Sequence, residues 1–292
     1  MLLRNTKFLY FAGKPASRAE IYIPEMRYFM NAEEIRISID DSYMNVIRFG
    51  HGKKALVMLS GISLLGLEGQ GEAVAEAYKS FWNEYTVYLF DRRKRMPASF
   101  TTDDMVDDVL FCLDKLGVKK ADFFGASHGG MMALVIALRK PEIVKSLFLA
   151  SSCARASETC VSVMEKWISL AKAGDIRELN TDFVRRVFTP SVAESFLSSM
   201  GAALDAGTQE DCERFIVLCR AVEDFDVLGR LGEISAPAIV VGAREDRVLT
   251  PESSLELAGG LHAPVYLYPG YGHAVYDEAP DYKERILGFF RG

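Results

Sequence analysis

The sequence predicts an α/β protein whose mostly parallel, doubly wound sheet carries inserted helices over its carboxyl edge. Through the first half of the chain, apolar strand-like runs alternate with helical patterns, which is typical of a parallel sheet. From about residue 153 to 226 the strand patterns stop and helical spacing continues, after which strands resume. We therefore expect a sheet core of residues 33–152 and 227–292, a helical cap of residues 153–226, and an N-terminal leader of residues 1–32.

Composition narrows the class of protein. The chain has 292 residues, 49% of them hydrophobic and 25% charged, which is ordinary for a globular protein. A net charge of -6 with interspersed signs disfavours nucleic-acid binding. Five cysteines without a CxxC pair disfavour a disulfide framework and favour a cytoplasmic location. No apolar run approaches the roughly 20 residues of a membrane span, and the N-terminus lacks a signal-peptide pattern, so no membrane partner is expected.

The first elements follow from period-two patterns. Residues 34–47 alternate around a polar Asp40-Asp41-Ser42 turn and predict a β-hairpin. The continuous apolar run 55–59 predicts a strand buried on both faces, which ends in a loop of small residues at 60–66. Helical spacing over 71–85 and an apolar run at 87–90 predict the next helix and strand.

A charged loop at 91–95 is expected to be solvated, and the Thr101–Asp104 segment begins the following helix. Further elements then alternate in the same way. Strands are predicted directly before Ser127 and near 143–149, 237–241 and 265–268. Helices are predicted after Ser127, at 161–171, 183–187, 192–204, 210–222 and 251–258, and at the C-terminus.

The segment 123–130 is the stretch around which this pattern is organised. It passes from a strand into a helix through Gly125-Ala126-Ser127-His128-Gly129. A nucleophile at the tip of such a sharp turn has a strained backbone, and glycines on either side relieve the crowding of the flanking chain. The N-terminus of the following helix favours negative charge that develops beside the serine. Ser127 is therefore the candidate nucleophile.

Two further strand ends supply partners for a serine nucleophile. Asp246 follows the strand at 237–241, and His273 follows the strand at 265–268. A serine hydroxyl needs an imidazole to accept its proton, and the imidazole needs a carboxylate to fix its tautomer. Glu245 is an alternative acid one residue away. The remaining histidines fit the role of base less well: His51 lies in another loop, His262 precedes its strand, and His128 adjoins the nucleophile.

These motifs resemble those of the α/β-hydrolase superfamily, specifically its capped branch of esterases, lactonases, carbon–carbon bond hydrolases, haloperoxidase-like enzymes and prolyl aminopeptidases. The resemblance covers roughly residues 34 to 290. It rests on segment 125–130, on Asp246 to Pro251, and on Gly270-Tyr271-Gly272-His273. The chain order Ser127, Asp246, His273 is the order expected for this fold.

The resemblance also implies an oxyanion hole made of two backbone N–H groups. One belongs to His128 and the other to a residue of the loop after the strand at 55–59. That loop usually begins His-Gly in the family, whereas here it reads Ser60-Gly61, and Ile62 is the candidate donor. The missing loop histidine is a departure that leaves the loop's conformation open.

We expect a small-molecule substrate, an acyl-enzyme mechanism, and neither metal nor cofactor, since HExxH and GxGxxG motifs are absent. The substrate would be a small apolar carboxylic ester or related acyl compound. Alternatives are a prolyl-type aminopeptidase using Asp182, Glu210 or Glu213 for the substrate amine, a carbon–carbon bond hydrolase, and a non-catalytic ligand-binding protein. The protein is expected to be a monomer or homodimer. The expected pocket residues are Leu64, Leu65, Trp167, Phe183, Phe188, Phe215, Val248 and Ala274.

Overall fold

The computed structural model of the protein describes residues 32–292. The expected leader therefore lies outside the described residues except for Ala32, which begins the first strand. The described chain forms one eight-stranded sheet in the order β1-β2-β4-β3-β5-β6-β7-β8. The strands are β1 Ala32–Ile39, β2 Ser42–Phe49, β3 Lys54–Leu59, β4 Tyr85–Phe90, β5 Ala121–Ala126, β6 Val144–Ala150, β7 Ala238–Ala243 and β8 Val265–Tyr268.

The sheet is parallel from β4 through β3, β5, β6 and β7 to β8, and the hairpin β1–β2 adds two antiparallel strands at one edge. Residues of β5 are buried along its whole length. Parallel strands place all their carboxyl ends at one edge, so the loops that follow β3, β5, β7 and β8 converge there.

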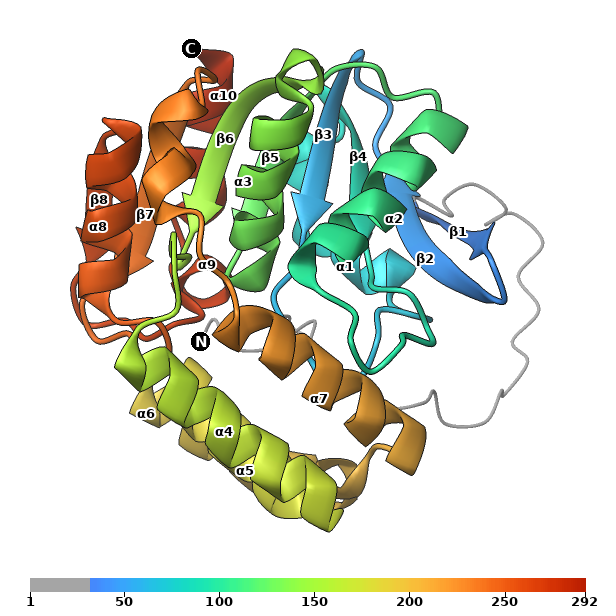
Figure 1. Cartoon of the computed structure of the whole chain (residues 1–292), viewed down its shortest axis with the longest axis vertical. Helices are drawn as coiled ribbons and strands as arrows, with labels where there is room; N and C mark the ends of the chain where they lie inside the picture. Colours follow the sequence, from blue (N-terminus) through green and yellow to red (C-terminus); the bar gives the residue numbers. More distant parts are fainter. Residues whose placement is uncertain (1–31) are drawn as a thin grey trace, which may run out of the picture.

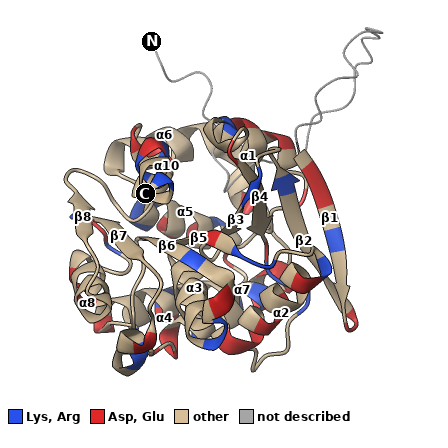
Figure 2. Cartoon of the chain, turned by 90° about the horizontal axis from the view of Figure 1, so that it is seen from above, with Lys and Arg blue, Asp and Glu red and all other residues tan. Residues whose placement is uncertain are grey.

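Helices cover both faces of this sheet. Figure 2 shows α1 and α10 on one face and α2, α3 and α8 on the other. The α-helices are α1 Gly71–Ala77, α2 Thr102–Lys115, α3 His128–Arg139, α4 Glu158–Ala173, α5 Ile176–Val187, α6 Pro190–Met200, α7 Gln209–Glu223, α8 Pro251–Leu261, α9 Val275–Glu278 and α10 Tyr282–Arg291. The short 3-10 turns are η1 Lys79–Phe81, η2 Pro141–Ile143, η3 Gly201–Asp205 and η4 Leu228–Glu233.

Helices α4 to α7 lie between β6 and β7 in the chain and form a layer beyond the carboxyl ends of the strands (Figure 1). We call α4–α7 the helical layer. Its interior is aromatic: the rings of Trp167 and Phe183 lie 4.9 Å apart, and that of Phe215 lies 6.2 Å from Trp167. Burying aromatic rings against one another stabilises such a layer.

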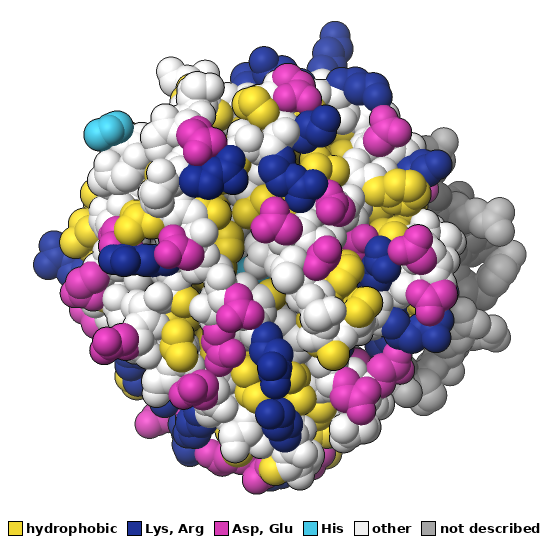
Figure 3. All heavy atoms as spheres, in the orientation of Figure 1, with side chains coloured by type: hydrophobic (Ala, Val, Ile, Leu, Met, Phe, Trp, Pro, Cys, Tyr) yellow, Lys and Arg dark blue, Asp and Glu magenta, His cyan; other side chains and the backbone are white. Residues whose placement is uncertain are grey.

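The surface is mixed in charge. On the face drawn in Figure 3, acidic and basic side chains alternate and apolar side chains occur in small groups. Within residues 32–292, no helix is both long enough and apolar enough to cross a membrane.

The structure corrects three details of the predicted elements. The helix expected over 71–85 ends at Ala77 and continues as a 3-10 turn, and the four-residue helix α9 was not predicted. The charged loop at 91–95 is only partly solvated, because Arg92 and Arg93 are buried and paired. Arg93 binds Asp108 through two hydrogen bonds of 2.9 and 2.5 Å.

Candidate active site

Ser127 occupies the turn between β5 and α3, with a backbone that L-residues rarely adopt. Its φ is 53° and its ψ is -123°, so the residue carries strain that the surrounding hydrogen bonds must hold. Its N–H donates to the carbonyl of Ala150 at 2.8 Å, and its own carbonyl accepts from the Ser152 hydroxyl at 2.8 Å. These two bonds attach the turn to the end of the neighbouring strand β6.

Glycines on either side make this turn sterically possible. A Cβ on Gly125 would lie 2.6 Å from the carbonyl oxygen of Gly129, and a Cβ on Gly129 would lie 1.9 Å from that of Leu59. Any larger residue at position 129 would therefore push α3 away from the end of β3. The close approach of these backbones is the physical reason for the Gly-x-Ser-x-Gly spacing.

His273 and Asp246 form a buried pair at the ends of β8 and β7. His273 Nδ1 lies 2.8 Å from Asp246 Oδ2, and the two residues are 4% and 6% exposed. The other oxygen, Asp246 Oδ1, accepts from the backbone N–H groups of Val248 and Leu249 at 2.8 and 3.0 Å. Glu245, the alternative acid, instead faces solvent and accepts from the N–H of Gly270.

The Asp246 carboxylate is ionised although it is buried. Burial alone would raise its pKa, but His273 and the two backbone N–H groups outweigh burial and hold the pKa below its ordinary value of 3.8. An ionised carboxylate only accepts hydrogen bonds, so the proton of neutral His273 lies on Nδ1. The Nε2 atom is then the nitrogen that remains free to accept a proton.

Ser127 and His273 line the same narrow cavity between the sheet edge and the helical layer. Its empty space is about 340 Å³, counting the open mouth. Among the described residues 32–292, no hydrogen bond joins the Ser127 hydroxyl to the His273 ring. Hydrogen bonds between a nucleophile and its base are often long before a substrate is bound. The remaining wall is largely apolar and includes Met164, Trp167, Phe183, Val187, Val248 and Tyr276.

The structure separates the expected pocket residues into three groups. Trp167, Phe183 and Val248 line the cavity that contains Ser127, whereas Leu65 lines a neighbouring one. The others are buried elsewhere. Phe215 packs behind Trp167, Phe188 packs on Phe196 at 5.0 Å, and Leu64 and Ala274 are buried without lining this cavity. Helical spacing marks the buried side of a helix, which here includes both the cavity wall and the interior of the layer.

Six lining residues were not among the expected ones: Gly61, Met164, Val187, Val222, Leu249 and Tyr276. Met164 lies three positions before Trp167 on α4, so its place on the same face could have been found from helical spacing. Tyr276 lies three residues after His273, in the short helix α9. No periodic signal identifies so short a helix.

His128 points away from the cavity. Its Nε2 lies 3.0 Å from the Thr102 hydroxyl, which itself donates to the carbonyl of Ala221. Because the Thr102 hydroxyl proton is already donated to Ala221, the hydroxyl oxygen accepts from His128, and Nε2 of His128 carries a proton. Burial, with Arg92 nearby, holds its pKa well below 6.5. The side chain of His128 is therefore no base for Ser127.

The backbone N–H groups of Ile62 and His128 are the candidate oxyanion donors. Neither donates to an acceptor in the part of the chain that the structure describes. The N–H of His128 begins α3, where the positive end of the helix dipole lies. Ile62 lines the cavity together with Ser127. Two unused N–H donors beside a serine are suited to bind a developing negative charge.

A buried charged network holds the loop that carries Ile62. Arg92 Nη2 donates to the carbonyl of Ser60 at 2.7 Å, at the start of the loop. Asp91 Oδ2 accepts from the N–H of Leu67 at 2.8 Å, at its end. Asp91 Oδ1 accepts from the N–H of Arg92 and from Arg214 Nη2 at 2.7 and 2.9 Å. Asp91 therefore joins the end of the loop to helix α7, while Arg92 holds its start.

The sequence interpretation missed Asp91 and Arg92. Their position directly after the strand β4 was the available signal, since carboxyl ends of parallel strands meet at the site. The network also contacts the position at which this loop departs from the family's pattern. Ser60 stands where a histidine is usual, and its carbonyl is held by Arg92.

The fold and this constellation define an α/β hydrolase. The family model described as "alpha/beta hydrolase fold" matches residues 68–280, and the chain belongs to this family. The relatives are named as hydrolases, and the protein is a hydrolase enzyme.

Several curated relatives are similar over most of the chain. The protein "Putative carbamate hydrolase RutD" of Rhizobium rhizogenes is 28% identical over 240 residues, covering 77% of this chain and 90% of its own. The "3-oxoadipate enol-lactonase 2" of Acinetobacter baylyi is 23% identical, covering 73% and 80%. The "2-hydroxy-6-oxononadienedioate/2-hydroxy-6-oxononatrienedioate hydrolase" of Klebsiella pneumoniae is 26% identical, covering 89% and 94%.

Solved structures agree on the fold. MGS-M2, an alpha/beta hydrolase enzyme from a Medee basin deep-sea metagenome library, superposes with a TM-score of 0.80 at 22% identity, covering 88% of this chain and 98% of its own. The enol-lactonase from Burkholderia xenovorans superposes with a TM-score of 0.76 at 19% identity, covering 88% and 100%.

Proposed function

We propose that the protein is a serine hydrolase that cleaves a small, apolar carboxylic ester or a related acyl compound. The observation that carries the proposal is the cavity shared by Ser127 and His273, with His273 bonded to the ionised Asp246 behind it. Ser127 is the nucleophile, His273 the general base and Asp246 the residue that orients and stabilises the imidazole.

The chemistry follows from these positions. Ser127 Oγ attacks the substrate carbonyl carbon while its proton passes to His273 Nε2, and the carbonyl oxygen becomes an oxyanion held by the N–H groups of Ile62 and His128. The oxyanion collapses, the carbon–oxygen bond to the leaving group breaks, and the alcohol leaves with the proton. Water then attacks the acyl-enzyme with His273 again as base, which releases the acid and free Ser127.

The cavity wall favours an uncharged substrate. Apart from the Ser127 and His273 groups, its side chains are apolar or aromatic, and burying apolar surface there is favourable. The lactonase and carbamate hydrolase among the relatives act on acyl compounds by name, which supports this class of reaction. The similarity to a named carbon–carbon bond hydrolase keeps that reaction as the alternative.

An aminopeptidase is less well supported. Asp182, a candidate partner for a substrate amine, is already bonded to Lys166, Trp167 and Arg186 at 2.6, 2.9 and 2.9 Å. Glu210 and Glu213 line a different groove on α7. No carboxylate among the described residues lines the Ser127 cavity, so the site offers no partner for a charged amine.

The proposal includes three further expectations. We propose that the cap is the helical layer, formed within residues 153–226 between core segments 33–152 and 227–292. The location is taken as cytoplasmic, because the five cysteines are free and buried in the structure and need no oxidising compartment. The protein would act on its small-molecule substrate as a monomer or homodimer.

A substrate panel tests the function. Purified protein is assayed with p-nitrophenyl esters, lactones, prolyl amides and carbon–carbon hydrolase substrates. We expect turnover of short esters, abolished in Ser127→Ala and His273→Ala proteins whose circular dichroism and melting temperature match the wild type. Selective turnover of prolyl amides, or esterase activity retained in Ser127→Ala, would contradict the proposal.

A further inference from the structure

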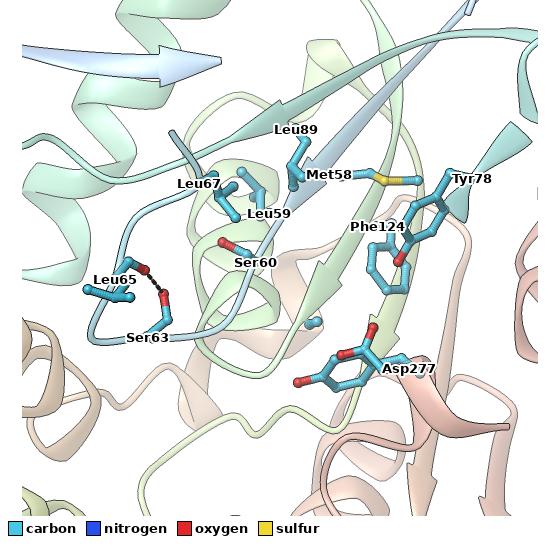
Figure 4. Close-up of a pocket in the computed structure, with 12 residues that line it drawn as sticks. Met58, Leu59, Ser60, Ser63, Leu65, Leu67, Tyr78, Leu89, Phe124 and Asp277 are labelled. Atoms are coloured by element: carbon cyan, nitrogen blue, oxygen red, sulfur yellow. Dashed lines mark hydrogen bonds between the residues drawn. The ribbon is translucent and has the colours of Figure 1, made fainter. Parts of the chain in front are cut away.

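A second cavity adjoins the one that contains Ser127, on the α1 face of the sheet. The side chains of Met58, Leu89 and Phe124 stand in one row across β3, β4 and β5, because these residues are paired in register. They form the floor of a largely apolar cavity whose empty space is about 580 Å³, counting its mouth. Figure 4 shows these side chains to the right of the Ser60–Leu67 loop.

This cavity and the Ser127 cavity share a wall. Tyr276 lines both, and the neighbouring residues Ser60 and Gly61 line one each, as do Ala126 and Ser127. A chain attached to Ser127 would have to pass Tyr276 and the segment Ser60–Ser63 to reach the second cavity. Ligand pockets are typically lined by apolar and aromatic side chains with a few polar groups, as this cavity is.

One charged side chain borders the second cavity. Asp277 comes from α9, and Figure 4 shows its carboxyl group below the aromatic rings of Phe124 and Tyr78. The carboxyl oxygens make no hydrogen bond or ion pair with any residue in 32–292. A partly buried carboxyl group that has no protein partner at the wall of an apolar cavity is free to form hydrogen bonds with a ligand.

The surroundings of Asp277 select the kind of partner. Burial raises its pKa to about 7, against the opposing effect of Lys283 and with a smaller raising effect of Glu278. Both protonation states are therefore populated near neutral pH, and a hydroxyl group, which donates and accepts, can bind either. A ligand ammonium would face the Lys283 ammonium, which lies 4.9 Å from the Tyr78 ring, and a ligand carboxylate would face Asp277.

We propose that the second cavity binds the acyl chain of the substrate, and that Asp277 binds a hydroxyl group near the far end of that chain. The substrate class is then a medium-chain hydroxyacyl ester. This inference rests on the proposed function, because it assigns the chain of the acyl-enzyme formed on Ser127. Asp277 is a specificity-determining residue, and the apolar floor contributes affinity for the methylene groups.

The test compares p-nitrophenyl acetate, octanoate and 8-hydroxyoctanoate. Each methylene buried contributes about 0.8 kcal/mol, so kcat/KM should rise about fourfold per methylene until the cavity is filled. In Leu89→Trp, where the cavity is filled by the protein, the ratio of octanoate to acetate kcat/KM should fall at least tenfold. In Asp277→Leu, the preference for 8-hydroxyoctanoate over octanoate should be lost. Phe111→Ala, an exposed residue on α2, is the matched control that should keep both ratios.

A binding measurement separates this inference from the proposed function. Ser127→Ala protein is titrated with 1-octanol and 1,8-octanediol by calorimetry, which needs no turnover. Tighter binding of the diol, lost in Asp277→Leu on the same background, supports the inference even if no ester is cleaved. Acetate turnover with a flat chain-length profile, and equal binding of the two alcohols, would overturn the inference while leaving the hydrolase assignment intact.

Discussion

The buried pair of Asp91 and Arg214 gives a sharp test of how the helical layer and the Ile62 loop are held. The side chains are only 9% and 4% exposed, and their charged atoms lie 2.9 Å apart. In Asp91→Ala, the guanidinium of Arg214 stays buried without its carboxylate, and the N–H of Leu67 loses its acceptor. Breaking a buried pair from one side typically costs 3–5 kcal/mol, so we expect a loss of roughly that size.

Activity should fall together with stability, but for a separate reason. Asp91 also accepts from the N–H of Arg92, whose side chain holds the carbonyl of Ser60. Losing that support displaces the Ile62 loop, and the loss of one oxyanion donor costs about 10²–10³ in kcat. We expect Asp91→Ala to lower kcat by up to about 100-fold with a smaller change in KM.

A double-mutant cycle separates the two effects. In Asp91→Ala/Arg214→Leu no unpaired charge remains, so the free energy of unfolding in urea should recover by about 2 kcal/mol or more relative to Asp91→Ala. Activity should stay low, because the loop still lacks its acceptor. Asp205→Ala is the matched control: it breaks the exposed pair with Arg177 and should cost less than about 1 kcal/mol. An equal loss of unfolding free energy in Asp91→Ala and Asp205→Ala, or full activity in Asp91→Ala, would refute the reasoning.

Three further outcomes are expected. The pKa of Asp277 is about 7 in the folded protein and 3.8 ordinarily, so the folded protein holds this proton more tightly and the resulting stabilisation is lost as pH rises towards 7. Between pH 5 and 8, the free energy of unfolding of Asp277→Asn in urea melts should therefore rise by roughly 2–3 kcal/mol relative to that of the wild type. Gly129→Ala, whose Cβ would meet Leu59, should cost more than about 3 kcal/mol, whereas Gly288→Ala in an open helical position should be neutral or stabilising. Asp246→Asn should lower kcat by up to about 10⁴-fold while the protein stays folded, and near-normal turnover would remove Asp246 from the mechanism.

Much of the fold could be predicted because its signals are local. The hairpin around Asp40 and the strands before Ser60 and Ser127 follow from periodicity and from glycines in tight turns. The 3-10 turn after Ala77 could not, because the residues keep helical spacing while tertiary contacts set the turn. The Trp82 indole, for example, donates to the carbonyl of Ala75.

The candidate site likewise contains residues that the sequence predicts and residues that it does not. The sequence motifs place Ser127, Asp246 and His273 at three strand ends, where the parallel sheet brings them to one edge. The network of Asp91 and Arg214 could not be predicted, since 123 residues separate the partners and a charged loop is usually solvated. Nor does helical spacing say which aromatic residue of the helical layer faces the cavity and which packs behind it, as Phe215 does.

Covalent labelling of Ser127 tests the central claim most directly. Wild-type protein is treated with a fluorophosphonate probe, digested and analysed by mass spectrometry. We predict a single adduct on Ser127, which is absent in Ser127→Ala and forms much more slowly in His273→Ala. In the wild type, the adduct should form at the same rate at which ester turnover is lost. Labelling at another residue, or turnover that survives full modification of Ser127, would contradict the account.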